Sequence, residues 1–357
     1  GPSSGSSARM PPSGEMSTRR IGRGPSASST VTLRTTSHPG QRRGSTTTGP
    51  PPASSDVAGE TQPISNNSAG ARNGPAAYSV TPLMLALLVL LAAPIEIRTS
   101  VDGATPTPGW VYARAGQKVV LHAPSGSAYA WYELRPQEPY VDNTVPSFHF
   151  AQLHYHAVEL TRCRGQQTCE VQGPGLPGLA GVGTTAYQLK LRTPDGRDAS
   201  TPGAEATKWG GLTRDVHRVT FRLDDSYLGY LTELVGTPYI FGSAGPDGRN
   251  QTDLLIGADC ADLAVYGQRR LGRKAEYVST YTIDQQAPLV KGPVRRGDVL
   301  HFPSTRHVAV LWEDRPPLGV LDESDLMLHT CWAPPKIEPL GANPTCASQP
   351  WRVLRSK

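Results

Sequence analysis

Three side chains in the second half of the chain have the types needed for thiol chemistry. Cys260 stands where a turn runs into an apolar segment of helical period, so we expect a helix to begin there. The positive end of a helix dipole favours the thiolate, which is the nucleophilic form of a cysteine. His307 opens one strand-like run, and His329 lies in another. A cysteine, a base and an orienting group are the three parts of a thiol hydrolase.

The segments that must position these residues predict an α+β domain over residues 224–357. Asp225 or Ser226 can cap a helix whose apolar face ends at Gly236, and a second helix is expected from Cys260 to about Leu271. Strands are expected at 298–302, 308–312 and 326–331. Helices would come first and an antiparallel sheet would follow, which is an α+β arrangement.

Residues 105–222 read instead as short strands separated by turn residues. Aromatic and β-branched side chains are concentrated at 110–113, 118–122, 128–134, 148–160 and 185–191. This pattern predicts a β-sandwich-like accessory domain of immunoglobulin-like size. Trp110, Trp131 and Trp209 are interpreted mainly as core aromatics of that domain, and a sugar-binding platform is the alternative.

The first 82 residues consist largely of Ser, Thr, Gly, Pro and Arg. Such a segment cannot bury enough apolar surface to offset its ordering entropy, so we expect it to be disordered. It holds eight Arg and three acidic residues, a balance of +5, which equals the net charge of the whole chain of 357 residues. The remainder is therefore neutral and has no basic stripe with interleaved aromatics, so no nucleic-acid partner is expected.

Residues 83–97 form an apolar segment, with eleven consecutive apolar residues at 83–93. The run is shorter than the roughly 20 residues that span a bilayer and is typical of a signal-peptide core. We therefore expect an exported protein, periplasmic, secreted or at the cell surface, and anchoring in the membrane through 83–97 belongs to the same hypothesis. A buried core helix is the alternative, and a start of translation near Met84 is a further interpretation of the long segment that precedes this run.

Export would place five cysteines in an oxidising compartment. Cys163 and Cys169 flank an expected hairpin tip, and Cys331 and Cys346 bracket a Pro-rich loop. Two local disulfides are predicted from these positions, which leaves Cys260 as a free thiol.

A set of short motifs occurs in order between about residues 227 and 340. They are Gly236-Thr237-Pro238-Tyr239-Ile240-Phe241-Gly242, Asp259-Cys260-Ala261-Asp262-Leu263, Gln285 or Gln286, Arg296-Gly297-Asp298-Val299-Leu300-His301-Phe302, His307-Val308-Ala309-Val310 and Leu328-His329-Thr330. Together they resemble the NlpC-type cysteine peptidases, which are bacterial cell-wall hydrolases with a compact papain-like α+β fold. The first 225 residues are not covered by the resemblance.

The resemblance implies a role for each matched residue. Cys260 would be the nucleophile, His307 its general base, and His329 the polar group that orients His307. Tyr239 would line the oxyanion side of the cleft, and Asp259 would hold a free amine of the substrate. Attack on an amide carbonyl requires a thiolate, a proton donor for the leaving amine and donors for the oxyanion, which agrees with these roles.

The chain departs from the family pattern at three positions. Ala261 and Asp262 replace the family Ser-Gly, and Phe241 replaces a Trp. The helix dipole and Asp262 are expected to act in opposite directions on the pKa of the thiol. Polar insertions at 243–257 and 313–325 are expected to border the cleft and to influence the choice of substrate.

We therefore expect a thiol-dependent hydrolase that cleaves an amide bond, with peptidoglycan stem peptides as the substrate that the resemblance implies. No cofactor and no metal are expected, although a Cys/His/His zinc site is the minor alternative. The accessory domain would place the enzyme on the wall or on a partner of unknown kind. Two other readings stay open: a catalytically inactive binding or scaffolding module, and an amidase toxin or acyltransferase on the same scaffold.

Overall fold

The computed structural model describes residues 95–244, 250–347 and 350–355. The expected tail at 1–82 and residues 83–94 of the apolar segment lie outside this range. Ile97, at the end of that segment, is 2% exposed and packs in the core of the β-rich region. Within the described residues no helix has both the length and the apolar character to cross a membrane.

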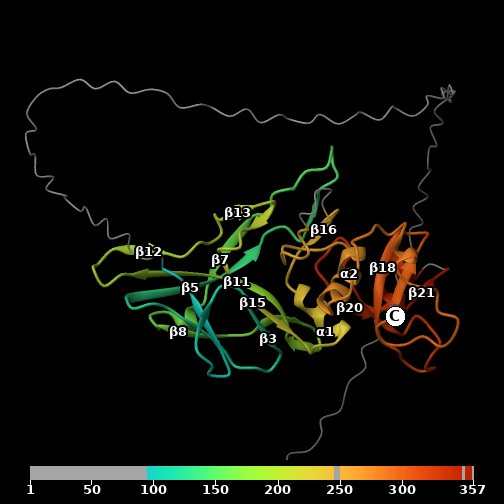
Figure 1. Cartoon of the computed structure of the whole chain (residues 1–357), viewed down its shortest axis with the longest axis horizontal. Coiled ribbons are helices and arrows are strands. Elements are labelled where there is room, and N and C mark those ends of the chain that lie inside the picture. The colour runs from blue at the N-terminus through green and yellow to red at the C-terminus, as the bar shows by residue number, and fades with distance from the viewer. Residues whose placement is uncertain (1–94, 245–249, 348–349, 356–357) are drawn as a thin grey trace, which may run out of the picture. The chain divides into compact units, whose positions relative to one another are not determined.

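The chain folds as a mixture of helices and strands in which sheets predominate (Figure 1). The N-terminal part contains a four-stranded sheet in the order β2-β1-β4-β8. Its strands are Thr107–Pro108 (β2), Arg98–Val101 (β1), Val119–His122 (β4) and Thr168–Val171 (β8). A six-stranded sheet follows the order β3-β15-β11-β5-β7, with β12 paired to β11. These strands are Val111–Arg114 (β3), His217–Arg222 (β15), Gly183–Arg192 (β11), Ser127–Pro136 (β5), Tyr155–Glu159 (β7) and Asp198–Ser200 (β12).

Side chains of both sheets meet in one hydrophobic core, which is the layered packing that a sandwich requires. Trp131 of β5 is fully buried there, which confirms its interpretation as a core aromatic. The Cys163–Cys169 disulfide joins the 3₁₀ turn Thr161–Cys163 to β8 in the same core, as predicted. A disulfide at this position suits an oxidising compartment.

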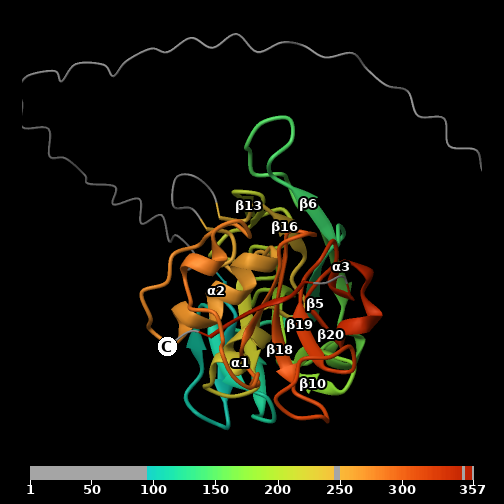
Figure 2. The same cartoon turned by 90° about the vertical axis from the view of Figure 1, so that its right-hand side faces the viewer.

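Three short strand pairs connect the larger elements. Two are antiparallel hairpins, Gly173–Leu176 (β9) with Leu179–Gly181 (β10) and Thr207–Lys208 (β13) with Gly211–Leu212 (β14). The third pairs Tyr140–Asp142 (β6) in parallel with Tyr239–Phe241 (β16), so that a segment of the β-rich part lies beside a segment close to Cys260 (Figure 2).

The C-terminal part places helices against an antiparallel sheet in the order β20-β19-β18-β17-β21. The strands are Lys336–Pro339 (β20), Leu326–His329 (β19), His307–Glu313 (β18), Val299–Phe302 (β17) and Arg352–Leu354 (β21). The α-helices are Tyr227–Leu231 (α1), Cys260–Arg270 (α2) and Pro344–Ala347 (α3), and the 3₁₀ turns are Thr232–Leu234, Ile283–Gln285 and Leu340–Ala342. The three strands predicted here are present.

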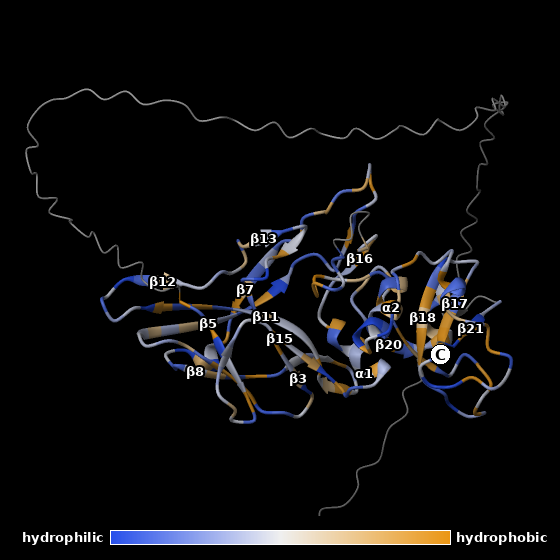
Figure 3. Cartoon of the chain, viewed as in Figure 1, coloured by the Kyte–Doolittle hydropathy of each residue, from blue (hydrophilic) through white to orange (hydrophobic). Residues whose placement is uncertain are grey.

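The strand period of two gives this sheet two buried faces. Val308 and Val310 pack toward α1 and α2, whereas Ala309 and Leu311 pack toward a second cluster on the other face. Burial on both faces explains why β17 and β18 are almost uniformly hydrophobic (Figure 3).

Two of the expected elements are shorter than predicted. The strand expected at 148–160 is confined to β7, because the preceding backbone bonds to loops: His149 donates to the carbonyl of Asn143, and Leu153 donates to that of Gly210. The helix expected to end at Gly236 becomes α1 followed by a 3₁₀ turn. Thr232 lies at this change, where its hydroxyl bonds back to the carbonyl of Gly229 at 2.6 Å.

Candidate active site

Cys260 is the first residue of α2, which runs for 11 residues. Asp259 caps the helix, because its Oδ1 accepts hydrogen bonds from the N–H groups of Ala261 and Asp262 at 3.0 and 2.9 Å. The N–H of Cys260 itself has no acceptor among the described residues. An unpaired N–H at a helix N-terminus beside a thiol is available to bind an oxyanion.

The packing of α2 on β18 brings Cys260 beside Val308, the residue that follows His307. Cys260 and Val308 belong to one hydrophobic cluster. The backbone N–H of Val308 is close enough to the Sγ of Cys260 to lower the pKa of the thiol. The thiol therefore lies close to the strand residue that follows His307.

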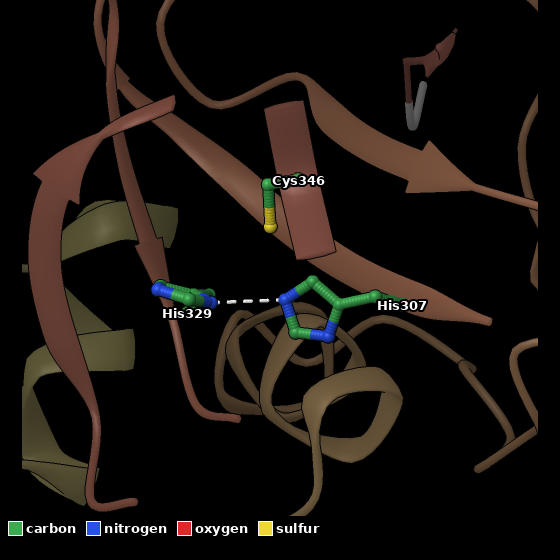
Figure 4. Close-up of side chains that lie close together, drawn as sticks. All are labelled: His307, His329 and Cys346. Carbon is green, nitrogen blue, oxygen red and sulfur yellow. Dashed lines mark hydrogen bonds between the residues drawn. The ribbon is translucent and has the colours of Figure 1, made fainter. Parts of the chain in front are cut away.

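A chain of hydrogen bonds crosses three neighbouring strands behind the thiol. The Nε2 of His307 on β18 lies 2.9 Å from the Nδ1 of His329 on β19 (Figure 4). The Nε2 of His329 lies 2.8 Å from the Oε1 of Glu338 on β20. The order of the three side chains follows the order of the strands in the sheet. We call this arrangement the His307–His329–Glu338 chain.

Glu338 is held as a carboxylate at the end of this chain. Burial raises its pKa, but hydrogen bonds from Lys336, Asn343 and His329 outweigh burial, and the net effect lowers the pKa of Glu338. The Nζ of Lys336 lies 2.8 Å from Oε2, and the Nδ2 of Asn343 lies 2.8 Å from Oε1. Glu338 can therefore only accept hydrogen bonds.

The carboxylate fixes which nitrogen of His307 is basic. His329 must donate from Nε2 to Glu338, so the Nδ1 of its neutral ring is an acceptor. His307 must then donate from Nε2, which leaves the lone pair of its neutral ring on Nδ1. This Nδ1 has no hydrogen-bond partner in the described part of the chain. It is the nitrogen that can accept a proton from a thiol.

Cys260 and His307 are both uncharged in this arrangement. Burial and then the Asp259 carboxylate raise the pKa of Cys260 well above its ordinary value, although the N–H of Val308 acts in the other direction. Burial and then His329 lower the pKa of His307 to about 3. Of the two influences expected from the sequence, Asp262 does raise the pKa of the thiol, but burial and Asp259 raise it more. The resting pair is a thiol and a neutral imidazole.

Of the two acidic residues beside Cys260, Asp259 is half-buried and Asp262 is buried. Burial raises the pKa of Asp259 to about 6, and burial followed by repulsion from Asp259 raises the pKa of Asp262 well above its ordinary value. The hydroxyl of Ser243 donates to Asp262. Asp262 is only 2% exposed, so the residue that replaces the family Gly is part of the buried structure.

Four aromatic residues lie together near Cys260, and we call them the aromatic cluster: Tyr140, Tyr239, Phe241 and Trp332. Burial and then Cys260 and Asp259 raise the pKa of Tyr239, which places its hydroxyl close to both. The ring centroid of Trp332 lies 4.8 Å from Tyr140, 5.7 Å from Tyr239 and 6.2 Å from Phe241. Tyr140 comes from β6, so the β-rich part of the chain contributes to the site.

Access to the thiol is restricted. Cys260 is 5% exposed, whereas Trp332 is 60% exposed and has a positive φ of 52°. Trp332 follows Cys331, whose thiol is close enough to Cys260 to raise its pKa. Trp332 therefore belongs to the exposed part of the aromatic cluster, next in sequence to a thiol that lies near Cys260.

The predicted Cys331–Cys346 disulfide is wrong, because both thiols are free. Cys346 is fully buried in the second hydrophobic cluster of the sheet, and its Sγ lies within 4.8 Å of the ring nitrogens of His307 and His329. The thiol of Cys331 accepts a hydrogen bond from Thr345 instead. The two sulfurs thus have different partners.

His307, His329 and Cys346 are a group whose ligand atoms are close enough to hold a metal ion (Figure 4). The zinc site considered as a minor alternative from the sequence used Cys260 as its cysteine. In the structure Cys346 takes that place beside the two histidines. In this geometry the two ring nitrogens that would face an ion are bonded to each other at 2.9 Å. The direct hydrogen bond favours a relay of protons over a metal site.

Glu338, Tyr140 and Trp332 are site residues that the sequence reasoning did not identify. For Glu338 a signal exists in the alternating run Lys336-Ile337-Glu338-Pro339, which predicts a short strand that begins seven residues after His329. For Tyr140 no such signal exists, because its position depends on the parallel pairing of β6 with β16.

A scan of the chain against protein-family models finds no match, and searches of curated proteins and of solved structures find none either.

Proposed function

We propose that this protein is a thiol-dependent hydrolase of amide bonds, in which Cys260 is the nucleophile and His307 the general base. His329 and Glu338 act as positioning residues. The observation that carries the proposal is the His307–His329–Glu338 chain, which leaves the Nδ1 of His307 as a free base next to the residue that lies beside the thiol. The resemblance of the chain's motifs to NlpC-type peptidases supports the same reaction. It also implies a papain-like fold and peptidoglycan stem peptides as substrates.

The first half of the reaction forms a thioester. The sulfur of Cys260 attacks the amide carbonyl carbon while its proton passes to the Nδ1 of His307. The carbonyl oxygen becomes an oxyanion, and the N–H of Cys260 and the hydroxyl of Tyr239 are the donors nearest to it. The C–N bond then breaks, and His307 returns the proton to the departing amine.

The second half releases the acid. A water molecule gives a proton to His307 and attacks the thioester carbon. The C–S bond breaks, the sulfur recovers the proton from His307, and the product leaves as a carboxylic acid. Glu338 stabilises the charge on the imidazoles during both halves, because its carboxylate ends the hydrogen-bond chain.

A catalytically inactive binding module is the second candidate. The observation in its favour is the closed site, in which Cys260 is 5% exposed and has a raised pKa. In that case the aromatic cluster would be the surface that contacts a ligand, and Cys260 would be a small buried core residue.

Digestion of purified muropeptides by the full chain tests the proposal. Mass spectrometry of the products should show cleavage of one amide bond by addition of one water. Cys260→Ala should fold normally and lose this activity, whereas Cys331→Ala, which removes a neighbouring thiol, should keep most of it. Activity above a few per cent in Cys260→Ala would exclude the covalent mechanism. Muropeptide binding without turnover in the unaltered chain would favour the binding module.

A further inference from the structure

Arg218 lies on β15 in the β-rich part of the chain and is only 3% exposed. Its guanidinium carbon lies 4.4 Å from the ring centroid of Trp110. It donates hydrogen bonds to the carbonyl oxygens of Leu212 at 2.8 Å and Leu254 at 3.3 Å. A guanidinium has five N–H donors, so three remain without an acceptor among the described residues.

The charge of Arg218 has no carboxylate partner in the described part of the chain. The charged or titratable groups that act on it are Tyr155, Tyr112 and Arg214, and burial lowers its pKa to about 10. A buried cation is costly unless it is paired and hydrogen-bonded. Stacking on Trp110 offsets part of that cost, and an anion in the adjoining cavity would offset more of it.

A cavity of about 220 Å³ adjoins Arg218. Arg214 and Lys208 also line it, and neither forms an ion pair with a described residue. Asp215 is the only carboxylate in the lining among the described residues. Three cations against one acidic group make the cavity positive and therefore suited to an anion.

One further feature of the lining points to a ligand. The hydroxyl oxygen of Thr213 is buried and has no hydrogen-bond partner in the described residues. Trp209 and Gly210 form the two-residue turn of the β13–β14 hairpin, and both have the positive φ that such a turn requires. The Nζ of Lys208 lies 4.5 Å from the centroid of the Trp209 ring.

The remaining walls of the cavity are apolar. Leu212, Leu254 and Ile256 line it together with Trp209. A bare inorganic anion would leave these walls without contacts, whereas an organic acid would place its carboxylate on the cations and its apolar body on the walls. A carboxylate also matches the paired donors of a guanidinium. We propose that this cavity binds the carboxylate of a small organic acid or of a peptide C-terminus.

Calorimetric titration of the full chain tests this assignment without any measurement of activity. The probes are benzoate and N-acetylalanine, each with its neutral amide, and inorganic phosphate. At least one carboxylate should bind, and its amide should bind at least tenfold more weakly. Tighter binding of benzoate would indicate an aromatic acid as the ligand, and tighter binding of N-acetylalanine would indicate a peptide C-terminus. Equal binding of acid and amide, no binding of either acid, or phosphate binding as tightly as the carboxylate would overturn the proposal.

Variants locate the site. Arg214→Gln and Thr213→Val change groups at the cavity edge and should each weaken carboxylate binding, the first about tenfold or more. Arg218→Met should abolish carboxylate binding. If that variant does not fold, the binding measured for Arg214→Gln and Thr213→Val tests the assignment. Arg197→Gln is the control, because Arg197 is an exposed arginine paired with Asp195 and does not line the cavity. Unchanged binding in Arg214→Gln and Thr213→Val would refute the assignment.

Discussion

His329 donates from Nε2 to the Oε1 of Glu338 at 2.8 Å, and this contact determines the basic nitrogen of His307 two strands away. Glu338→Gln removes the charge and allows the amide to donate to His329, which would reverse the direction of the hydrogen bonds. We expect kcat to fall about ten- to a hundredfold with little change in KM, because positioning of a general base contributes mainly in the transition state. Steady-state kinetics on one muropeptide measures both constants.

The control for this variant is Glu323→Gln, since Glu323 is an exposed acid on the loop before β19. Glu338→Asp keeps the charge and should recover part of kcat. If Glu338→Gln retained full kcat, Glu338 would only support the fold of β20.

The sequence contained enough information to predict the helix of Cys260 and the strands of the two histidines, because helical period, a capping aspartate and β-branched runs are local signals. The roles of Tyr140 and Trp332 could not be predicted. Tyr140 reaches the site through a parallel strand pairing across 99 residues, and Trp332 through a left-handed backbone conformation. The pairing of Cys331 with Cys346 is predicted from their positions on either side of a Pro-rich loop and from the expected export, and the burial of Cys346 beneath the sheet overrides it.

Trp332→Ala should open the approach to Cys260. The ring contacts Tyr140, Tyr239 and Phe241, so we expect its removal to expose the site around Tyr239, which lies near Cys260. We expect the rate of alkylation of Cys260 by iodoacetamide at pH 7 to rise at least severalfold, measured by peptide mass spectrometry. Leu318→Ala, at a residue that is 71% exposed, should leave the rate unchanged. Equal rates in both variants would mean that Trp332 does not cover the thiol.

The stability of the protein should fall as the pH is lowered from about 6.5 toward 3. The pKa of His307 falls from 6.5 to about 3 on folding, because burial disfavours the imidazolium. Below pH 6.5 the unfolded chain binds a proton that the folded chain does not, so each such histidine lowers the free energy of unfolding by up to about 1.4 kcal/mol per pH unit. His217, with a pKa lowered to about 4, acts in the same direction.

Urea unfolding at several pH values measures this dependence. His307→Gln should show a smaller loss of stability on acidification than the unaltered chain, and the exposed His156→Gln should not differ from it. A steep acid loss that persists unchanged in His307→Gln would show that His307 is protonated in the folded state.

Peptide mapping of the unreduced protein should find one disulfide among the five cysteines, between Cys163 and Cys169. Cys260, Cys331 and Cys346 should each be alkylated after unfolding in guanidinium chloride. Their accessibility before unfolding should differ, because Cys331 is partly exposed whereas the other two are buried. A Cys331–Cys346 bridge in the map would restore the pairing expected from the sequence and would require the Cys346 sulfur to leave the two histidines.

Asp259→Asn separates the structural role of Asp259 from its expected role in substrate binding. Asn is as good a helix cap as Asp, so the bonds to Ala261 and Asp262 can persist. The folded pKa of Asp259 is raised to about 6, so its charge opposes folding increasingly as the pH rises from 3.8 through 6. The variant should therefore be more stable than the unaltered chain at pH 7, and this gain should vanish at pH 3.5, as urea unfolding will measure.

The same variant should lose activity selectively. A carboxylate beside the nucleophile raises the pKa of Cys260, which is a disadvantage unless it binds a cation of the substrate. A charge-assisted hydrogen bond to a free amine is worth about 1.5 to 3 kcal/mol, so kcat/KM for substrates with a free amino terminus should fall roughly ten- to a hundredfold. Amine-blocked substrates should be turned over at an unchanged or higher rate, because the thiol becomes more acidic. Equal losses on free and blocked substrates would assign Asp259 to the helix cap alone.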